Sequence, residues 1–260
     1  MSKTYKTTDE LIEILESKKV SINDKNIAKY YIEKYSYYSI VNSYKWIFKE
    51  NNKYKDNASF EEIFAMYKFD KNLKVILLKY ILEVESIVKT KIANLFAENY
   101  GIENSNVEHI EKLILEINNE IDKGNGKHDA IIHYYNKYSF VPPWVVTKIL
   151  SLGTISKFYG LMKQSDRQKI SKTFNINDRL LKNILGNLTS VRNISAHDDR
   201  LYTYRSTFYI RLDNNKKSPD KALHTNMYII IKSLELLLEK EQYEEMTKNI
   251  NDELKILESK

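Results

Sequence analysis

The chain has 260 residues, of which 42% are hydrophobic, 6 are glycine and 3 are proline. This composition supports a large buried core and favours helices over a turn-rich β fold, so we expect an all-α protein. The absence of cysteine excludes disulfides, thiolate metal sites and a cysteine nucleophile, and the net charge of +6 favours a polyanionic partner only mildly.

Two short helices are predicted near the N-terminus. Residues 7–10, Thr-Thr-Asp-Glu, have the form of a capping box and begin a helix that should cover about 8–18. A second helix is expected over about 24–34. The stretch YSYYSIVNSYKWIF at 35–48 is dense in aromatic residues, which favours core packing over stacking on nucleic acid bases.

The strongest helical pattern predicts a long central helix with Asp70 as its N-cap. Its apolar stripe consists of Leu73, Leu77, Tyr80, Val84, Ile87, Val88 and Leu95. Glu85 borders this stripe one turn before Lys89, a spacing typical of a surface ion pair. Glu85 is also a candidate internal partner for an arginine.

The clearest loop is DKGNGK at 122–127. It separates an N-terminal helical part of about 1–121 from a part of about 128–260 within one domain, 1–260. Pro142 and Pro143 mark the end of one element and the start of the next. His133 lies among aromatic residues, where a histidine is more often structural than catalytic.

The segment after Arg200, LYTYRSTFYIRLD, is rich in β-branched and aromatic residues, which indicates an extended arm or a hairpin. A polar loop is expected at 214–219, followed by two last helices over about 220–239 and 242–258. The most apolar windows of the chain are too short and too charged to span a bilayer, and no leader-like segment precedes the first helix. We therefore expect a cytoplasmic protein with no membrane contact.

Residues 177–197 are predicted to form a helix whose end carries an unusual set of polar residues. At about 100° per residue, Arg192 falls on the apolar stripe, whereas Asn193 and His197 fall outside it. A guanidinium on an apolar face needs an anion, either a carboxylate such as Glu85 or a phosphate. All six arginines lie at or after Arg167, which favours a phosphate-handling C-terminal half.

The spacing Arg192-x4-His197 is not specific by itself, and the motifs of P-loop, serine hydrolase and zinc peptidase sites do not occur. The sequence nevertheless resembles the abortive infection family of bacterial phage-defence proteins, the Abi-like group that contains AbiD and AbiF. The hallmark VRN-x-x-AH-x-x-RL lies at 191–201. Further matching segments follow the family's order at 35–44, 67–85, 133–144 and 151–162.

That family is similar to the HEPN superfamily, helical proteins whose R-x4-6-H motif marks metal-independent ribonucleases that often dimerise. The resemblance implies a HEPN-like domain with additional N-terminal helices and an effector that cleaves RNA without a cofactor. It implies RNA as substrate, a homodimer, and an antitoxin or phage-derived trigger as regulator. The catalytic positions are Arg192, Asn193 and His197, and the candidate RNA contacts are Arg200, Tyr202 and Arg205. Tyr202 and Thr203 stand where many relatives carry Trp-Asn, which leaves the RNA contacts open.

The chemistry of these residue types is consistent with RNA cleavage. An imidazole such as that of His197 can move a proton at the ribose 2′-hydroxyl or the leaving 5′-oxygen. Arg192 is a two-pronged donor for the charged transition state, and Asn193 can orient the imidazole or the phosphate. On a straight helix Arg192 and His197 would lie about 140° apart, so a helix break or a two-fold cleft is needed to bring such groups together.

Two alternatives stay open from the sequence. The first is a non-catalytic HEPN-like module that binds RNA or a protein and signals infection by association. The second is a purely structural motif, in which Arg192 bonds to Glu85 and His197 caps the end of its helix.

Overall fold

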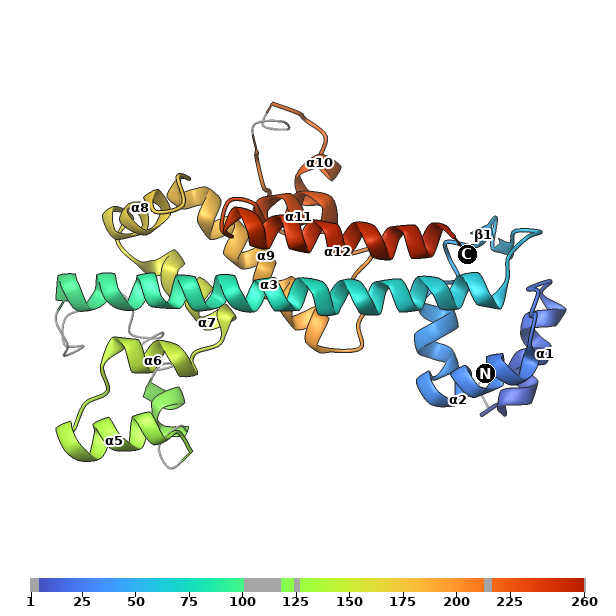
Figure 1. Cartoon of the computed structure of the whole chain (residues 1–260), viewed down its shortest axis with the longest axis horizontal. Helices are drawn as coiled ribbons and strands as arrows, with labels where there is room; N and C mark the ends of the chain where they lie inside the picture. Colours follow the sequence, from blue (N-terminus) through green and yellow to red (C-terminus); the bar gives the residue numbers. More distant parts are fainter. Residues whose placement is uncertain (1–4, 101–117, 124–126, 213–216, 260) are drawn as a thin grey trace. The chain divides into compact units, whose positions relative to one another are not determined.

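The computed structural model describes residues 5–100, 118–123, 127–212 and 217–259 (Figure 1). Helices dominate these residues, which confirms the predicted all-α class; the HEPN-like topology stays a prediction. The described part contains one small antiparallel sheet, formed by β1 (Lys49–Glu50) and β2 (Lys53–Tyr54). Asn51 and Asn52 both adopt positive φ between the two strands, as a two-residue hairpin turn requires.

The chain forms two compact units built from discontinuous segments. The first comprises residues up to Leu77, Ile194–Tyr202 and residues from Glu244 onward; the second comprises Leu78–Asn193 and Thr203–Tyr243. Three helices contribute to both units: α3 (Phe60–Tyr100), α9 (Asp178–Ala196) and α12 (Lys240–Glu258). The predicted loop at 122–127 falls partly outside the described residues, since 124–126 are not described, and the division that it marks stays a prediction.

The N-terminal helices of the first unit confirm their predictions. In α1 (Thr8–Ser17) the side chains of Thr7 and Glu10 form the expected capping box. In α2 (Lys25–Tyr35) the N-cap Asp24 accepts hydrogen bonds from two backbone amides of the first turn. The next turn is a short π-helix, η1 (Tyr38–Asn42), within the aromatic stretch.

The aromatic stretch is only partly core. Ile40, Val41 and Tyr44 are buried, as expected for core packing. Tyr38 and Trp46, however, are 73% and 45% exposed, so the prediction of core packing is wrong for these two side chains. Tyr38 and Trp46 therefore form part of the protein surface.

The central helix begins at Phe60, and its N-cap lies eleven residues before the predicted one. Ser59 caps α3, because its hydroxyl accepts from the Glu62 amide while the Glu62 carboxylate accepts from the Ser59 amide. Asp70 is therefore an interior helical residue with no exposed surface, and its prediction as an N-cap is wrong. The predicted apolar stripe is buried apart from Ile87, which is half-buried. Within the first unit, α12 runs alongside the first part of α3 (Figure 1), where Asn72 Nδ2 donates to Glu253 Oε2 at 2.8 Å.

The second unit contains α5 (Asp129–Tyr138), α6 (Pro143–Ile149), α7 (Leu152–Leu161), α8 (Gln164–Lys172), α10 (Ala222–Thr225) and α11 (Met227–Leu234). Pro143 occupies the first turn of α6, as predicted. His133 packs edge-to-face against Tyr134 and Tyr138. The helix predicted over 220–239 is interrupted, because Asn226 ends α10 and accepts from the Ile229 amide as the N-cap of α11.

The segment 203–212 is an extended arm without strand structure, which is one of the two predicted forms. Asn187 Nδ2 donates to Phe208 O and Asn183 Nδ2 donates to Tyr209 O, both at 2.9 Å. On its other side the arm donates two backbone hydrogen bonds to Thr225 and His224. No helix of the described residues has the length and apolarity to cross a membrane.

Candidate functional site

Helix α9 ends inside the motif. It begins after Asn177, whose side chain accepts from the Leu180 amide, and it ends at Ala196. The His197 amide donates to Ile194 O at 3.2 Å, which closes the last turn in a tighter form. His197 therefore lies in a turn after the helix. The helix break that was expected as one way to overcome the separation of about 140° between Arg192 and His197 is present.

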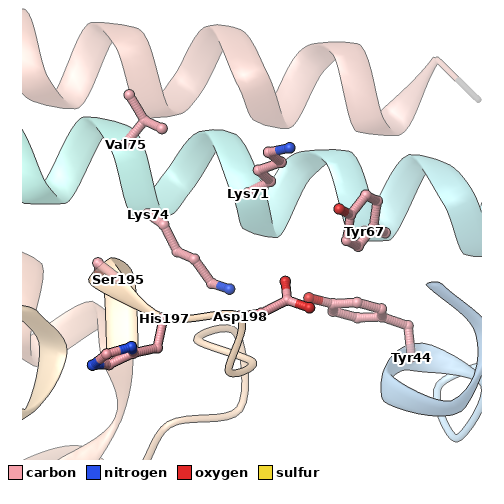
Figure 2. Close-up of a pocket in the computed structure, with 8 residues that line it drawn as sticks. All are labelled: Tyr44, Tyr67, Lys71, Lys74, Val75, Ser195, His197 and Asp198. Atoms are coloured by element: carbon pink, nitrogen blue, oxygen red, sulfur yellow. The ribbon is translucent and has the colours of Figure 1, made fainter. Parts of the chain in front are cut away.

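His197 lines a pocket of about 240 Å³ in the first unit (Figure 2). The other lining side chains come from the aromatic stretch, from α3 and from the end of α9: Tyr44, Tyr67, Lys71, Lys74, Val75, Ser195 and Asp198. The pocket thus combines an exposed imidazole, two lysines, a carboxylate and two phenols. This set offers both proton transfer and anion binding.

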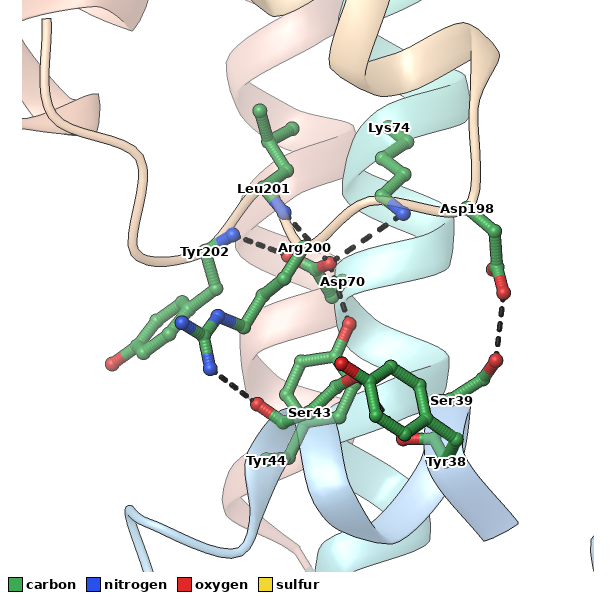
Figure 3. A network of polar contacts seen from close by, with 10 residues as sticks. All are labelled: Tyr38, Ser39, Ser43, Tyr44, Asp70, Lys74, Asp198, Arg200, Leu201 and Tyr202. Carbon is green, nitrogen blue, oxygen red and sulfur yellow. Dashed lines mark hydrogen bonds and ion pairs between the residues drawn. The ribbon is translucent and has the colours of Figure 1, made fainter. Parts of the chain in front are cut away.

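Asp70 holds the turn that carries His197 against α3 (Figure 3). Its Oδ2 accepts from the Leu201 amide at 3.0 Å and from the Tyr44 hydroxyl at 2.7 Å, and its Oδ1 accepts from the Tyr202 amide. Lys74, one helical turn further, lies 3.8 Å from Oδ2. Since Asp70 has no exposed surface, these partners take the place of the water that its charge has lost.

Two further contacts fix the turn on its other side. Ser39 Oγ donates to Asp198 Oδ2 at 2.7 Å. Arg200 donates from its guanidinium to Ser43 O and lies over the Trp46 ring, 5.3 Å from its centroid. The residues around His197 are therefore anchored at three places, which restricts where the imidazole can lie.

The two phenols of the pocket stay protonated well into the alkaline range. Burial, reinforced by the Asp70 carboxylate, raises the pKa of Tyr44 far above its usual range. Burial also raises the pKa of Tyr67, with a smaller contribution from Asp198. Both side chains therefore stay neutral, and neither adds negative charge to the pocket.

The other two motif residues lie before the helix end. Arg192 is half-buried on the apolar stripe, and its buried Nε has no hydrogen-bond partner in the described part of the chain. Asn193 is exposed. Neither residue is among those that line the pocket. The structure therefore places one of the three predicted catalytic residues, His197, in the pocket.

A model of the Abi-like protein family matches residues 30–203. The chain belongs to the Abi-like family. The matched range contains every residue that lines the pocket and the whole Arg192-x4-His197 motif. The family suggests a role in abortive infection, a defence against phage. No curated protein and no solved structure matches the chain.

In this Abi-like chain Glu85 pairs with Lys89, with Oε1 2.6 Å from Nζ. The predicted pairing is present, but it is not a surface pair, since the side chains are only 11% and 15% exposed. The second carboxylate oxygen of Glu85 is buried without a hydrogen-bond partner among the described residues. The alternative in which Arg192 bonds to Glu85 is thus not the arrangement observed.

The three predicted RNA contacts have different surroundings. Arg200 is exposed but engaged with Ser43 and Trp46, and Tyr202 is 44% exposed with its ring edge-to-face to Phe69. Arg205 is exposed in the second unit. Their contact with RNA stays a prediction.

Sequence reasoning missed Asp70 and Lys74 as residues of the Abi-like site. A signal was present, because Asp70, Leu73 and Leu77 recur at the spacing of one helix face. A carboxylate on such a face must be satisfied internally. Among the described residues, no group of three or more histidine, aspartate or glutamate side chains is arranged to hold a metal ion.

Proposed function

We propose that this Abi-like protein is an abortive infection effector that cleaves RNA without a metal ion, with His197 as the residue that moves the proton. One observation supports this proposal above the others: His197 leaves helix α9 at its end and lines the same pocket as Lys74. The pocket thereby joins an imidazole, which can accept or donate a proton, with a cation that can bind a phosphate.

The proposed reaction uses the RNA's own 2′-hydroxyl as nucleophile. The 2′-oxygen bonds to the adjacent phosphorus as it gives up its proton, and the bond from phosphorus to the 5′-oxygen breaks as that oxygen takes a proton. The products are a 2′,3′-cyclic phosphate and a 5′-hydroxyl. One imidazole can serve either proton transfer, and Arg192 would stabilise the negative charge that develops on the phosphate oxygens.

The remaining parts of the proposal concern assembly and control. A single Arg192-x4-His197 motif supplies one histidine, so a homodimer is the economical source of a second. Asn193 would orient the imidazole or the phosphate. Such an activity is toxic to its host, so a partner, either an antitoxin or a regulatory RNA, would restrain it until a phage-derived trigger appears.

The test is RNA cleavage by the purified full chain with EDTA present. Total cellular RNA and tRNA are incubated with the wild type, with His197→Ala and with His128→Ala, and the new 3′ ends are analysed. His128 is the matched control because it is also exposed but does not line the pocket. We expect wild type and His128→Ala to leave 2′,3′-cyclic phosphate, and His197→Ala to lose at least about 100-fold in rate.

Equal cleavage by the wild type and His197→Ala would contradict the proposal. If neither protein cleaves, even after treatment that removes a co-purified inhibitor, while both bind RNA, the non-catalytic binding module becomes the better account.

A further inference from the structure

Lys74 carries a charge that its neighbours leave unsatisfied. Its side chain is 11% exposed, and its Nζ lies 3.8 Å from Asp70 Oδ2, too far for a hydrogen bond. Within the part of the chain that the structure describes, its ammonium group has no hydrogen-bond acceptor. A largely desolvated cation of this kind gains more from an incoming anion than a hydrated surface lysine does.

The same carboxylate is much better satisfied than the lysine beside it. Asp70 accepts from Leu201, Tyr202 and Tyr44, three donors that stabilise its charge without Lys74. Neutralising Asp70 is therefore not a sufficient reason for a lysine here. The ammonium of Lys74 instead points into the pocket, between Ser195 and Asp198 (Figure 2).

Three other groups on the pocket wall affect how the pocket would receive an anion. Ser195, which lines the same pocket as Lys74, has a buried Oγ without a hydrogen-bond partner among the described residues, so the pocket wall holds a second unused donor. Lys71 is engaged differently, because its Nζ lies over the Tyr35 ring, 4.8 Å from the centroid. Asp198 opposes an anion, although Ser39 donates to its carboxylate.

We propose that Lys74 binds a non-bridging phosphate oxygen of the RNA in the pocket that His197 lines. The phosphate thus receives a cation from the same unit of the chain as the histidine, independently of Arg192. This inference rests on the proposed function, since RNA is the anion that the pocket is taken to hold. It assigns substrate binding to a residue outside the Arg192-x4-His197 motif.

The test measures binding separately from cleavage. Fluorescence anisotropy is recorded on the full chain with a fluorescein-labelled single-stranded RNA whose riboses are all 2′-O-methylated, because this RNA lacks the attacking hydroxyl. Lys74→Met is compared with wild type over a range of salt concentrations. Lys68→Met is the matched control, since Lys68 is an exposed lysine of the same helix outside the pocket.

We expect Lys74→Met to weaken binding about 10- to 100-fold, the loss typical of a charge-assisted hydrogen bond. The logarithm of the association constant decreases linearly with the logarithm of the salt concentration, and the magnitude of this slope should become smaller by about 0.7, because one phosphate contact is lost. Lys68→Met should leave that slope unchanged. Asp198→Asn, which keeps an acceptor for Ser39, should tighten binding severalfold, a gain that damage to the fold cannot produce.

A Lys74→Met protein with the wild-type salt slope overturns the inference, whether or not its affinity falls, because the loss then comes from the fold and not from a phosphate contact. Absence of binding by the wild type overturns it as well. A wild type that binds this RNA but cleaves no unmodified RNA overturns the proposed nuclease and leaves the assignment of Lys74 standing. If the wild type cleaves unmodified RNA but Lys74→Met keeps the wild-type salt slope, the proposed nuclease stands and the assignment of Lys74 is overturned.

Discussion

Asp70 organises the site because one buried carboxylate receives three donors from two separate segments of the first unit. Its partners are the Tyr44 hydroxyl and two successive backbone amides, those of Leu201 and Tyr202. The amides belong to the segment that follows His197, so the carboxylate fixes the exit of the motif turn. Asp70 acts on His197 only through this segment, which makes it a positioning residue.

Asp70→Ala should lower the free energy of unfolding by about 3 kcal/mol, because it leaves three buried donors without their acceptor and removes the carboxylate that lies 3.8 Å from Lys74 Nζ. Urea unfolding followed by circular dichroism measures the change. Asp199→Ala is the control, since Asp199 is exposed in the same turn, and we expect it to stay within about 0.5 kcal/mol of wild type. A similar small effect for both variants would mean that the Asp70 contacts do not hold the turn.

Tyr44 gives the stability of the protein a pH dependence on the alkaline side. Burial and Asp70 raise the pKa of Tyr44, whereas the unfolded chain's tyrosines ionise near pH 10. Above that pH the unfolded state has lost a proton that the folded state still holds. The free energy of unfolding therefore falls as pH rises, by up to about 1.4 kcal/mol per pH unit for this one group.

Tyr44→Phe should be less stable than wild type at pH 7, by about 1 to 3 kcal/mol, because the hydrogen bond to Asp70 is lost. Between pH 10 and the onset of unfolding, its stability should fall less steeply than that of wild type. Urea midpoints measured over this range test both statements. Tyr5→Phe, at a side chain that is 90% exposed, should follow the wild-type curve, and parallel curves for all three proteins would refute the assignment.

At the scale of elements, capping patterns explain which helix boundaries were predictable. The Thr7-to-Glu10 box was recognised, and α1 and α2 both begin within one residue of their expected starts, although the cap at Asp24 was not recognised as one. The start of α3 was missed although Ser59 and Glu62 form the same kind of box. Asp70 is a good N-cap residue type, but local preference yields to burial when a carboxylate finds tertiary donors. Those donors are far away in the sequence, so no local rule could supply them.

The break between α10 and α11 follows the same logic, since Asn226 satisfies a backbone amide that a continuous helix would have paired internally. An asparagine inside an apolar helical pattern is compatible with either outcome. The pocket shows the same limit for functional sites. The polar end of α9 could be predicted from the sequence, whereas the presence of Tyr44 and Lys74 in the same pocket depends on tertiary structure.

The contact between α9 and the extended arm can be tested at Gly186. An added Cβ there would lie 2.7 Å from Phe208 Cε2, so the ring must move. Gly186→Ala gains about 1 kcal/mol of helix propensity but loses packing of comparable size, and its stability should stay near that of wild type. In a Phe208→Ala background the same change should stabilise the protein by about 1 kcal/mol. A urea-unfolding cycle with equal effects in both backgrounds would show that the arm does not lie against this helix.

At the scale of the whole molecule, the family could be predicted from the order of several weak segments, and the match over residues 30–203 confirms it. The two compact units could not be predicted from the sequence, because each is assembled from discontinuous segments. The motif itself straddles them: Arg192 and Asn193 belong to the second unit, and His197 belongs to the first.

A mixing experiment tests whether two chains share one RNA-cleaving site. Arg192→Ala and His197→Ala are each expected to be inactive. If a site takes Arg192 from one chain and His197 from the other, a mixed dimer holds one doubly mutated site and one intact site. Equimolar mixing after dissociation makes about half of the dimers mixed, so about a quarter of the wild-type cleavage rate should return.

If both residues act within one chain, every site in the mixture keeps one defect and no activity returns. A mixture of His197→Ala with the double variant Arg192→Ala/His197→Ala is the control, because no arrangement of these two chains contains an intact histidine. Light scattering on the same samples establishes that dimers form. If dimers exchange chains but no cleavage returns, Arg192 and His197 of one chain act on the same phosphate. The end of α9 before His197 would then be the feature that lets both side chains reach it.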